Sequence, residues 1–270
     1  FFDVQIGDSA LHCLPADFIA GKMMLVRAMI LGLSLDLVQP TTQPMRDVYS
    51  SYDFAAMTPL QAHHSLGRLH QIKTLIIGGA PIYPELYDKL VSLHDNCFET
   101  YGMTETITHI AASKLSFPKK PFRALDGIHL NVDGQGCLIV DAPDMTDQLI
   151  QTNDLVEIHN KKTFTYLGRR DNVINSGGVK ISPEVVEQKL ANYIQFPFFL
   201  YGIPDKVLGQ KLIMVVEGDN RRLKEAEKQI AVINNLQKFE VPKAFYFISK
   251  ILRNNGKYMR SKTISTLEIC

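Results

Sequence analysis

The sequence has almost no excess of charge of one sign and no long apolar run, and each lack excludes a class of protein. Its 29 basic and 28 acidic side chains leave a formal net charge of +1, so no strong basic field is available to attract a nucleic acid. The most apolar stretch, residues 23–38, is interrupted by Arg27, Gly32 and Asp36. It falls short of the roughly 18 uninterrupted apolar residues that a membrane span needs. The sequence therefore predicts neither a nucleic-acid-binding protein nor a membrane span.

Cysteine and histidine patterns typical of metal sites are also missing. The four cysteines, at positions 13, 97, 137 and 270, form no C-x-x-C pair, and the eight histidines show no H-E-x-x-H spacing. A structural zinc and a disulfide framework are therefore not expected, which fits a reducing cytoplasm. The chain begins at Phe1 without the charged and apolar segments of a signal peptide. A soluble cytoplasmic protein is expected, and assembly into a homo-oligomer is left open.

A strand, a helix and a second strand are expected between residues 74 and 100. The apolar run 74–77 ends in the tight turn G-G-A-P at 78–81, Pro84 suits the first turn of a helix, and a short strand follows near 97–100. Because a right-handed crossover makes the two strands parallel, both following loops reach the same edge of the sheet, where open α/β sheets bind ligands. G-G-A-P and Y-G-M-T-E at 101–105 are therefore expected to share one cleft.

The pattern of expected helices and strands changes near Gly168 and indicates two domains. Residues 21–35 are apolar enough for a buried helix, and residues 127–149 predict short strands with a hairpin at Asp133-Gly134. After Asp171, one helix, two apolar strands, a polar helix over 222–236 and a last strand are expected. The predicted fold class is α/β, with a larger N-terminal portion built on a parallel sheet (1–170) and a small C-terminal α+β lid domain (171–270).

Four clusters of residues stand out together. They are G-G-A-P at 78–81, Y-G-M-T-E at 101–105, T-N-D at 152–154 with G-R-R-D-N-V-I-N-S-G-G-V-K-I at 168–181, and N-G-K at 255–257. Each alone has a plain explanation as a glycine turn, solvated polar chain or solvated lysine. Their order and spacing resemble the adenylate-forming superfamily of acyl-CoA synthetases, peptide-synthetase adenylation domains and luciferases. The I-N-S-G-G-V-K-I variant is most similar to its 2-succinylbenzoate-CoA ligase branch, which serves menaquinone synthesis.

This resemblance implies an ATP-dependent ligase with two half-reactions. A carboxylate attacks the α-phosphate of ATP and releases pyrophosphate, and the thiol of CoA then displaces AMP from the acyl-adenylate. The expected acid is 2-succinylbenzoate or another small aromatic carboxylate, with ATP and CoA as partners and Mg²⁺ as the metal. An adenylation domain that loads a carrier protein and a non-catalytic nucleotide- or CoA-binding remnant are the alternatives.

The same resemblance assigns roles to residues at matching positions. Thr104 would hydrogen-bond near the α-phosphate, Glu105 would hold Mg²⁺, and Lys257 would bridge the carboxylate and phosphate oxygens. Asp154 would accept from the ribose hydroxyls, with Arg169 supporting it. The residues expected to contact the nucleotide or CoA are Gly79, Ala80, Pro81, Tyr101, Gly102, Asp154, Arg169, Gly177, Gly178 and Lys180.

Further assignments concern the lid and the acyl pocket. Asp171 stands at the hinge about which the lid would rotate between half-reactions, so that Gly177 and Gly178 would then line the pantetheine passage. Phe18 is expected in the wall of the acyl pocket. Arg27 is either a helix-end arginine that reaches solvent or the partner of a second carboxylate on a dicarboxylic substrate.

Three features depart from the family pattern. Asn153 replaces the usual glycine of the T-G-D motif, which the tolerance of Asn for left-handed backbone would allow. Asn255 replaces the usual threonine before Gly-Lys. The glycine- and hydroxyl-rich phosphate loop of the family has no counterpart and is expected upstream of residue 1. The chain as given is therefore expected to keep contacts with AMP but to turn over ATP poorly.

Overall fold

The first part of the chain is built on five neighbouring parallel strands. A computed structural model describes residues 1–254 and 257–267. The strands are β1 (Ser9–His12), β2 (Ser34–Leu37), β3 (Tyr52–Met57), β4 (Ile72–Ile77) and β5 (Cys97–Gly102), in the order β2-β1-β3-β4-β5. Every neighbouring pair is parallel. The predicted parallel sheet is therefore confirmed, and the carboxyl ends of its strands share one edge.

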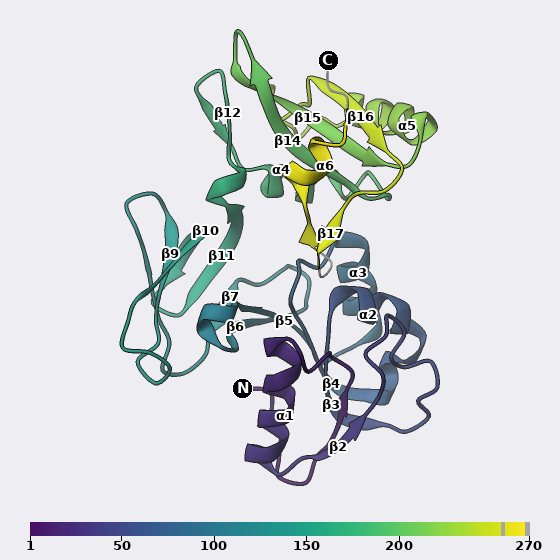
Figure 1. Cartoon of the computed structure of the whole chain (residues 1–270), viewed down its shortest axis with the longest axis vertical. Helices are drawn as coiled ribbons and strands as arrows, with labels where there is room; N and C mark the ends of the chain where they lie inside the picture. The colour runs from purple at the N-terminus through teal and green to yellow at the C-terminus, as the bar shows by residue number, and fades with distance from the viewer. Residues whose placement is uncertain (255–256, 268–270) are drawn as a thin grey trace. The chain divides into compact units, whose positions relative to one another are not determined.

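Helices cover both faces of this sheet because side chains alternate along its strands. The helices are α1 (Ile19–Leu31), α2 (Pro59–Ser65) and α3 (Pro84–Leu93), with the 3-10 turn η1 (Leu66–Gln71) after α2. Ile76 packs with Met24 of α1, whereas its neighbour Ile77 packs with Leu86 of α3. Figure 1 shows α1 on one side of β3 and β4, and α2 and α3 on the other.

Helix α1 is more exposed than the apolar run 21–35 predicts. Its buried residues are Gly21, Met24 and Ala28, whereas Met29 and Ile30 are 74% and 76% exposed. The prediction of a fully buried helix is wrong, because a helix that packs on one face of a sheet buries a single stripe.

Further strands extend the sheet beyond β5. In order, they are β6 (His109–Lys114), β7 (Phe122–Ala124), β11 (Thr163–Arg169), β10 (Ile150–Asn160), β9 (Cys137–Asp141) and β8 (His129–Val132). β8 and β9 pair antiparallel, and the Asp133 N–H donates to the Cys137 carbonyl oxygen at 2.9 Å. The hairpin predicted at Asp133-Gly134 is therefore confirmed.

The chain divides into two compact units. The first contains Phe1–Thr152 and Glu157–Thr165, and the second contains Asn153–Val156 and the chain from Tyr166 onward. Strands β10 and β11 therefore carry residues of both units. The passage at Tyr166 lies close to the boundary expected at residues 170 and 171, and a lid movement of the second unit stays a prediction.

A smaller mixed sheet forms the second unit. Its strands are β13 (Val179–Ile181), β12 (Ile174–Ser176), β15 (Gly209–Glu217) and β14 (Phe198–Asp205) in that order, with β16 (Ala244–Ile248) parallel to β15. Helices α4 (Pro183–Leu190) and α5 (Asn220–Ala231) pack against Met214 and Val216. Phe199 and Ile213 point to the other face, where Ile264 of α6 (Arg260–Ile264) packs. The α+β arrangement expected here is confirmed, although α5 ends before residue 236.

Gly21 sets how closely α1 approaches the preceding loop. A Cβ atom at this position would lie 2.1 Å from the Pro15 carbonyl oxygen. We expect Gly21→Ala to lower the free energy of unfolding by about 1–3 kcal/mol, because backbone must move to make room. Urea denaturation measures this loss. Gly67→Ala is the control, since a Cβ there meets nothing within 4 Å, and equal losses in both variants would contradict the steric explanation.

Candidate functional site

Two loops meet at the carboxyl edge of β4 and β5. The G-G-A-P loop at 78–81 follows β4, and the Thr100 hydroxyl near the end of β5 donates to the Ile77 carbonyl oxygen at 3.2 Å. A Cβ on Gly78 would lie only 2.4 Å from the Thr100 Oγ1 atom. The structure therefore brings the two loops together, as the expected strand-helix-strand unit requires.

The backbone of Gly79 is exposed and unobstructed at this edge. Its φ of +84° lies in the left-handed region that favours glycine. A Cβ at this position would meet no atom within 4 Å. Ala80 is half-buried and Pro81 is exposed. Backbone with free space above it suits the approach of a planar ring, and the contact of these residues with adenine stays a prediction.

The turn after β5 presents Thr104 and Glu105 to solvent. Both lie in the short 3-10 turn η2 (Thr104–Thr106) and are exposed, whereas Thr106 is fully buried. The Thr106 Oγ1 atom accepts from the Met103 N–H, just before this turn, at 3.0 Å. It donates to the Thr108 carbonyl oxygen at 2.8 Å. Ile107 takes a left-handed φ of +62°, which is strained for a β-branched residue. The sequence reasoning missed Thr106, although the alternation of threonines at 104, 106 and 108 was visible.

Tyr101 and Gly102 have structural reasons for their identity. The Tyr101 ring packs edge-on against Phe164, with ring centroids 5.2 Å apart. A Cβ on Gly102 would lie 2.5 Å from the His109 Cα atom and 2.6 Å from the Thr108 carbonyl oxygen. Close packing of β6 therefore requires glycine here, and contacts of both residues with a nucleotide stay predictions.

The T-N-D and G-R-R-D motifs meet within the second unit. Arg169 Nη1 lies 3.6 Å from Asp154 Oδ1, and Arg169 Nη2 donates to Asp171 Oδ2 at 3.0 Å. Arg170 Nη2 donates to Asn153 Oδ1 at 3.0 Å, and the Asn153 amide donates to Asp171 Oδ2 at 3.3 Å. The Asp154 side chain is only 13% exposed. One polar network therefore joins the predicted ribose acceptor to the predicted hinge residue.

Asn153 does not use the left-handed backbone that its place in the motif suggested. It lies in β10 and does not have a positive φ. That reasoning was wrong, because an extended strand accepts any residue at this position. Its amide instead connects Arg170 with Asp171.

Gly177 and Gly178 form the turn between β12 and β13. Their φ values are +60° and +82°, and Ser176 pairs with Val179 across the turn. A two-residue hairpin needs left-handed backbone at both positions, which accounts for the glycines. A Cβ on Gly178 would meet nothing within 4 Å. The turn is open to a ligand, with Lys180 exposed beside it, and a pantetheine passage stays a prediction.

Lys257 lies on a second small hairpin. Strands β17 (Arg253–Asn254) and β18 (Lys257–Tyr258) pair antiparallel, and the Lys257 side chain is exposed. Asn255, where the family usually has threonine, lies outside the described residues. The structure therefore leaves the predicted catalytic lysine exposed, and its role stays a prediction.

Arg27 is half-buried in an apolar cluster of the first unit. Its guanidinium lies over the Phe54 ring, 5.4 Å from the ring centroid, and its Nη1 atom lies 3.4 Å from Met24 Sδ. Within the described part of the chain no carboxylate lies within ion-pair distance of it. Packing on an aromatic ring disfavours the interpretation that Arg27 simply extends into solvent. Phe18, just before α1, is 51% exposed, and its role in a pocket wall stays a prediction.

His109 lies near Arg27, although nothing in the sequence connected them. The Phe2 ring packs edge-on against the imidazole, with centroids 5.4 Å apart. Burial and, secondly, the Arg27 charge lower the pKa of His109 to about 4. The imidazole is therefore neutral at neutral pH, and Arg27 supplies the charge of this pair.

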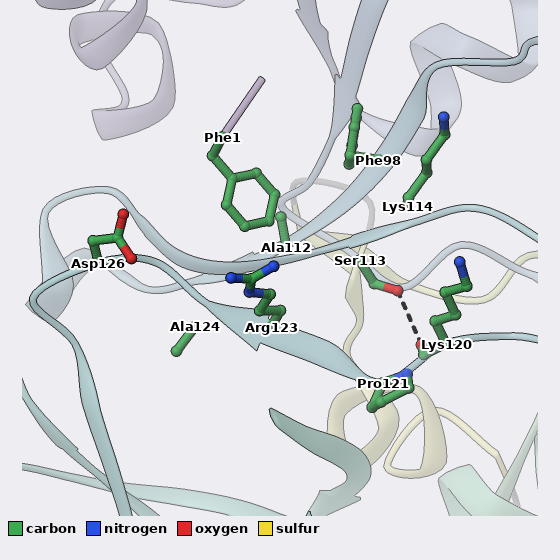
Figure 2. A pocket seen from close by; sticks show the side chains of 10 residues that line it. All are labelled: Phe1, Phe98, Ala112, Ser113, Lys114, Lys120, Pro121, Arg123, Ala124 and Asp126. Carbon is green, nitrogen blue, oxygen red and sulfur yellow. Dashed lines mark hydrogen bonds between the residues drawn. The ribbon is translucent and has the colours of Figure 1, made fainter. Parts of the chain in front are cut away.

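A cavity of about 450 Å³ opens beside β5, β6 and β7. Figure 2 shows Lys114, Lys120 and Arg123 around it, with the Ser113 hydroxyl donating to the Lys120 carbonyl oxygen at 2.9 Å. None of the residues predicted from the sequence lines this cavity. The candidate site is therefore the edge of the sheet rather than this hollow.

Similar proteins are known, although no family model matches the chain. The crystal structure of an AMP-forming acyl-CoA synthetase/AMP-acid ligase II-like protein from Dyadobacter fermentans is 34% identical and has a TM-score of 0.60, over 97% of this chain and 79% of that chain. The 2-succinylbenzoate-CoA ligases of Escherichia coli and Bacillus cytotoxicus are 25% and 24% identical over 92% and 96% of this chain. The chain spans 58% and 62% of the lengths of these two curated relatives.

Comparison of the fold with solved structures leads to the same class of proteins. The o-succinylbenzoate CoA synthetase (MenE) from Bacillus subtilis, in complex with ATP and magnesium ion, aligns over 97% of this chain and 62% of that chain, with a TM-score of 0.79 at 20% identity. The fold is therefore that of adenylate-forming enzymes, as the motifs predicted. Within that class, the chain belongs to the family of AMP-forming acyl-CoA synthetases and AMP-acid ligases.

In residues 1–254 and 257–267, no helix combines the length and apolar character needed to cross a bilayer.

His109 is expected to make the folded state sensitive to acid. Folding lowers the pKa of His109 from its ordinary 6.5 to about 4, so the unfolded chain binds the proton more tightly. The stabilisation is complete above pH 6.5 and is lost as the pH falls toward 4. We expect this residue to lower the free energy of unfolding by about 1–2 kcal/mol between about pH 7 and about pH 5.

Urea denaturation of the wild type and of His109→Gln at both pH values measures this effect. The variant is expected to lose less stability on acidification, because glutamine does not titrate. His12 and His94, whose pKa values burial also lowers, remain in both proteins and cancel in the comparison. The same loss in both proteins would contradict the prediction.

Proposed function

We propose that the protein is an ATP-dependent carboxylate-CoA ligase that works through an acyl-adenylate, with 2-succinylbenzoate as the acid. The observation that carries the proposal is the shared sheet edge, where Gly78 and Thr100 bring the G-G-A-P loop against the turn that presents Thr104 and Glu105. The names of the curated relatives support the acid, and the Bacillus subtilis neighbour, solved with ATP and magnesium ion, supports the nucleotide and the metal.

In the first half-reaction, a carboxylate oxygen of the acid bonds to the α-phosphorus of ATP as the bond to pyrophosphate breaks. An anion attacks an anion, so the site has to neutralise charge. Thr104 would donate its hydroxyl to the phosphate, and Lys257 would bring its ammonium to the reacting oxygens. Asp154, oriented by Arg169 at 3.6 Å, would accept from the ribose hydroxyls. Gly79, Ala80, Pro81, Tyr101 and Gly102 would surround the adenine.

Glu105 is the residue that fits Mg²⁺. Among the described residues, no three His, Cys, Asp or Glu side chains gather into a metal-binding group. Mg²⁺ does not require such a group, because it commonly binds through one or two carboxylates together with phosphate oxygens and water. An exposed carboxylate at the sheet edge suits that mode of binding. When bound, the ion would neutralise phosphate charge.

In the second half-reaction, the CoA thiol forms a bond to the acyl carbon while the bond to AMP breaks. The thiol proton leaves with AMP or solvent, so charge and atoms balance. The second unit would rotate about Asp171 between the half-reactions. The open turn at Gly177 and Gly178, with Lys180 next to it, would then admit the pantetheine arm and its phosphates.

Arg27 supports a dicarboxylic acid as the substrate. A half-buried guanidinium over Phe54 without a carboxylate partner among the described residues is costly to desolvate. A second carboxylate on the substrate would compensate this cost by a charge-assisted hydrogen bond. Neutral His109 would leave that attraction to Arg27 alone. Phe18 would contribute to the wall of the same pocket.

Lys257→Ala is expected to separate the half-reactions. Adenylation, measured by pyrophosphate release, should fall by about 100-fold or more, because a charge donor to the developing transition state is lost. Thioester formation from preformed acyl-adenylate should change little. Lys250→Ala is the control, because this lysine is also exposed on the second unit. Equal losses in the two half-reactions of Lys257→Ala would refute the assignment.

Arg27→Gln is expected to weaken use of the dicarboxylic acid specifically. The value of kcat/KM for 2-succinylbenzoate should fall by about 10- to 100-fold, the range for a lost hydrogen bond to a charged group. An analogue that lacks the second carboxylate should be used equally well by the variant and the wild type. Arg46→Gln, which changes an exposed arginine, should leave both substrates unaffected. A uniform loss with both acids would argue against carboxylate recognition.

The two rival functions give different products. A domain that loads a carrier protein would form the adenylate but no soluble thioester with free CoA. A nucleotide-binding remnant would bind AMP in a calorimetric titration and release no pyrophosphate with any aromatic acid. Pyrophosphate release over a panel of acids, followed by detection of acyl-CoA, therefore decides among the three.

A further inference from the structure

Arg260 is the centre of an enclosed ion-pair cluster in the second unit. Its side chain is only 12% exposed. Both terminal nitrogens bind Glu187 of α4, Nη1 through a short contact to Oε1 and Nη2 to Oε2 at 2.9 Å. Nη2 also lies 3.6 Å from Glu184 Oε1. Arg260 therefore holds the start of α6 against α4 with the paired geometry that only arginine provides.

The same pair binds the backbone of strand β14. Arg260 Nη1 donates to the Leu200 carbonyl oxygen at 2.9 Å, and the Leu200 N–H donates to Glu187 Oε1 at 2.6 Å. The Arg260 guanidinium also lies over the Phe199 ring, 5.8 Å from its centroid. Three chain segments, α6, α4 and β14, thus meet at a single guanidinium, so α6 cannot shift without breaking several hydrogen bonds together.

Glu184 extends this cluster to the predicted hinge. Its Oε1 atom accepts a short hydrogen bond from the Asn172 amide, and Asn172 lies in η3 (Arg170–Asn172) directly beside Asp171. Gly168 leaves room for the carboxylate, because a Cβ there would lie 2.5 Å from Glu184 Oε2. A movement of the hinge residues would therefore change the hydrogen bond between Asn172 and Glu184, and with it the contact between Glu184 and Arg260.

The cluster also flanks the hairpin that carries Lys257. Arg260 follows Lys257 in the chain, and the intervening Tyr258 ring packs against Phe199, with centroids 6.1 Å apart. On the other strand of the hairpin, Arg253 Nη1 lies 2.7 Å from Glu217 Oε2. Ion pairs therefore hold both flanks of the short hairpin to the body of the second unit.

We propose that Arg260 is a positioning residue for adenylation, which fixes the Lys257 hairpin and ties it to the hinge residues through Glu184 and Asn172. This inference rests on the proposed function of Lys257. It goes beyond that function because it assigns Arg260 a role that acts through Lys257 rather than through contact with substrate or reacting atoms. A purely structural ion pair would instead affect both half-reactions alike.

A double-mutant cycle tests this distinction. The combined change Glu187→Gln with Arg260→Met removes the Arg260–Glu187 ion pair, and Glu184 keeps its hydrogen bond from Asn172. It should reduce adenylation on the order of 100-fold, since small displacements of a positioned group have effects of this size. Thioester formation from preformed acyl-adenylate should stay near the wild-type rate. In the Lys257→Ala background the same pair of changes should cost little more, because residues that act as a unit are not additive.

Lys189 and Glu240 provide the matched control. They form another ion pair of the second unit, with Lys189 Nζ 2.6 Å from Glu240 Oε1, and within the described part of the chain Glu240 also accepts from the Gln237 N–H, away from the hinge. Lys189→Met with Glu240→Gln should lower the unfolding midpoint but leave the ratio of the half-reactions unchanged. Arg260→Lys keeps the charge and is expected to fold even where the methionine variant does not, with a smaller loss confined to adenylation.

Hydrogen exchange followed by mass spectrometry adds a readout that needs no activity. Loss of the Arg260–Glu187 ion pair should speed exchange in the segment around Lys257 and in residues 170–173, while β15 stays protected. Additive losses in the Lys257→Ala background, equal losses in both half-reactions, or unchanged exchange in these segments would each overturn the inference. Absence of pyrophosphate release from the wild-type, full-length protein would instead overturn the proposed function, and the exchange result would still report on the tie.

Discussion

The close approach of β4 and β5 is the constraint on which the candidate site of the first unit depends. The strands run parallel, so their following loops have to leave at the same edge. Gly78 allows the contact, since a Cβ there would collide with the Thr100 hydroxyl at 2.4 Å. With the strands at this distance, the open backbone of Gly79 and the turn with Thr104 and Glu105 lie at one edge of the sheet.

The two units differ in whether the charge of a buried or half-buried arginine is neutralised by a carboxylate. Arg260 is neutralised by Glu187 and Glu184, so the cost of removing it from water is offset within the protein. Arg27 is half-buried over Phe54, and no described carboxylate offsets its charge. The first arrangement suits a fixed structural connection, whereas the second leaves a charge whose desolvation no described carboxylate offsets.

Local patterns predicted several elements of the fold, because these patterns depend on neighbours in the chain. The apolar run before G-G-A-P, the proline at the start of α3 and the Asp133-Gly134 hairpin all formed where they were expected. Helix α1 was expected to be buried, and it is partly exposed because hydropathy does not show how many faces have a partner. The packing reasons for Gly102 and for the buried Thr106 hydroxyl could not be predicted, since both depend on how β5 turns into β6.

The sequence by itself determined the family, the strand-helix-strand unit at 74–100 and the residue types available for chemistry, because motif spacing and local periodicity are properties of the chain. Only the tertiary structure decided which charges have partners. It placed Arg27 near His109 and joined Arg260 to Glu187 and to the neighbours of Asp171. These residues lie far apart in sequence, and their interaction energies depend on distance and desolvation, which exist only after the chain has folded.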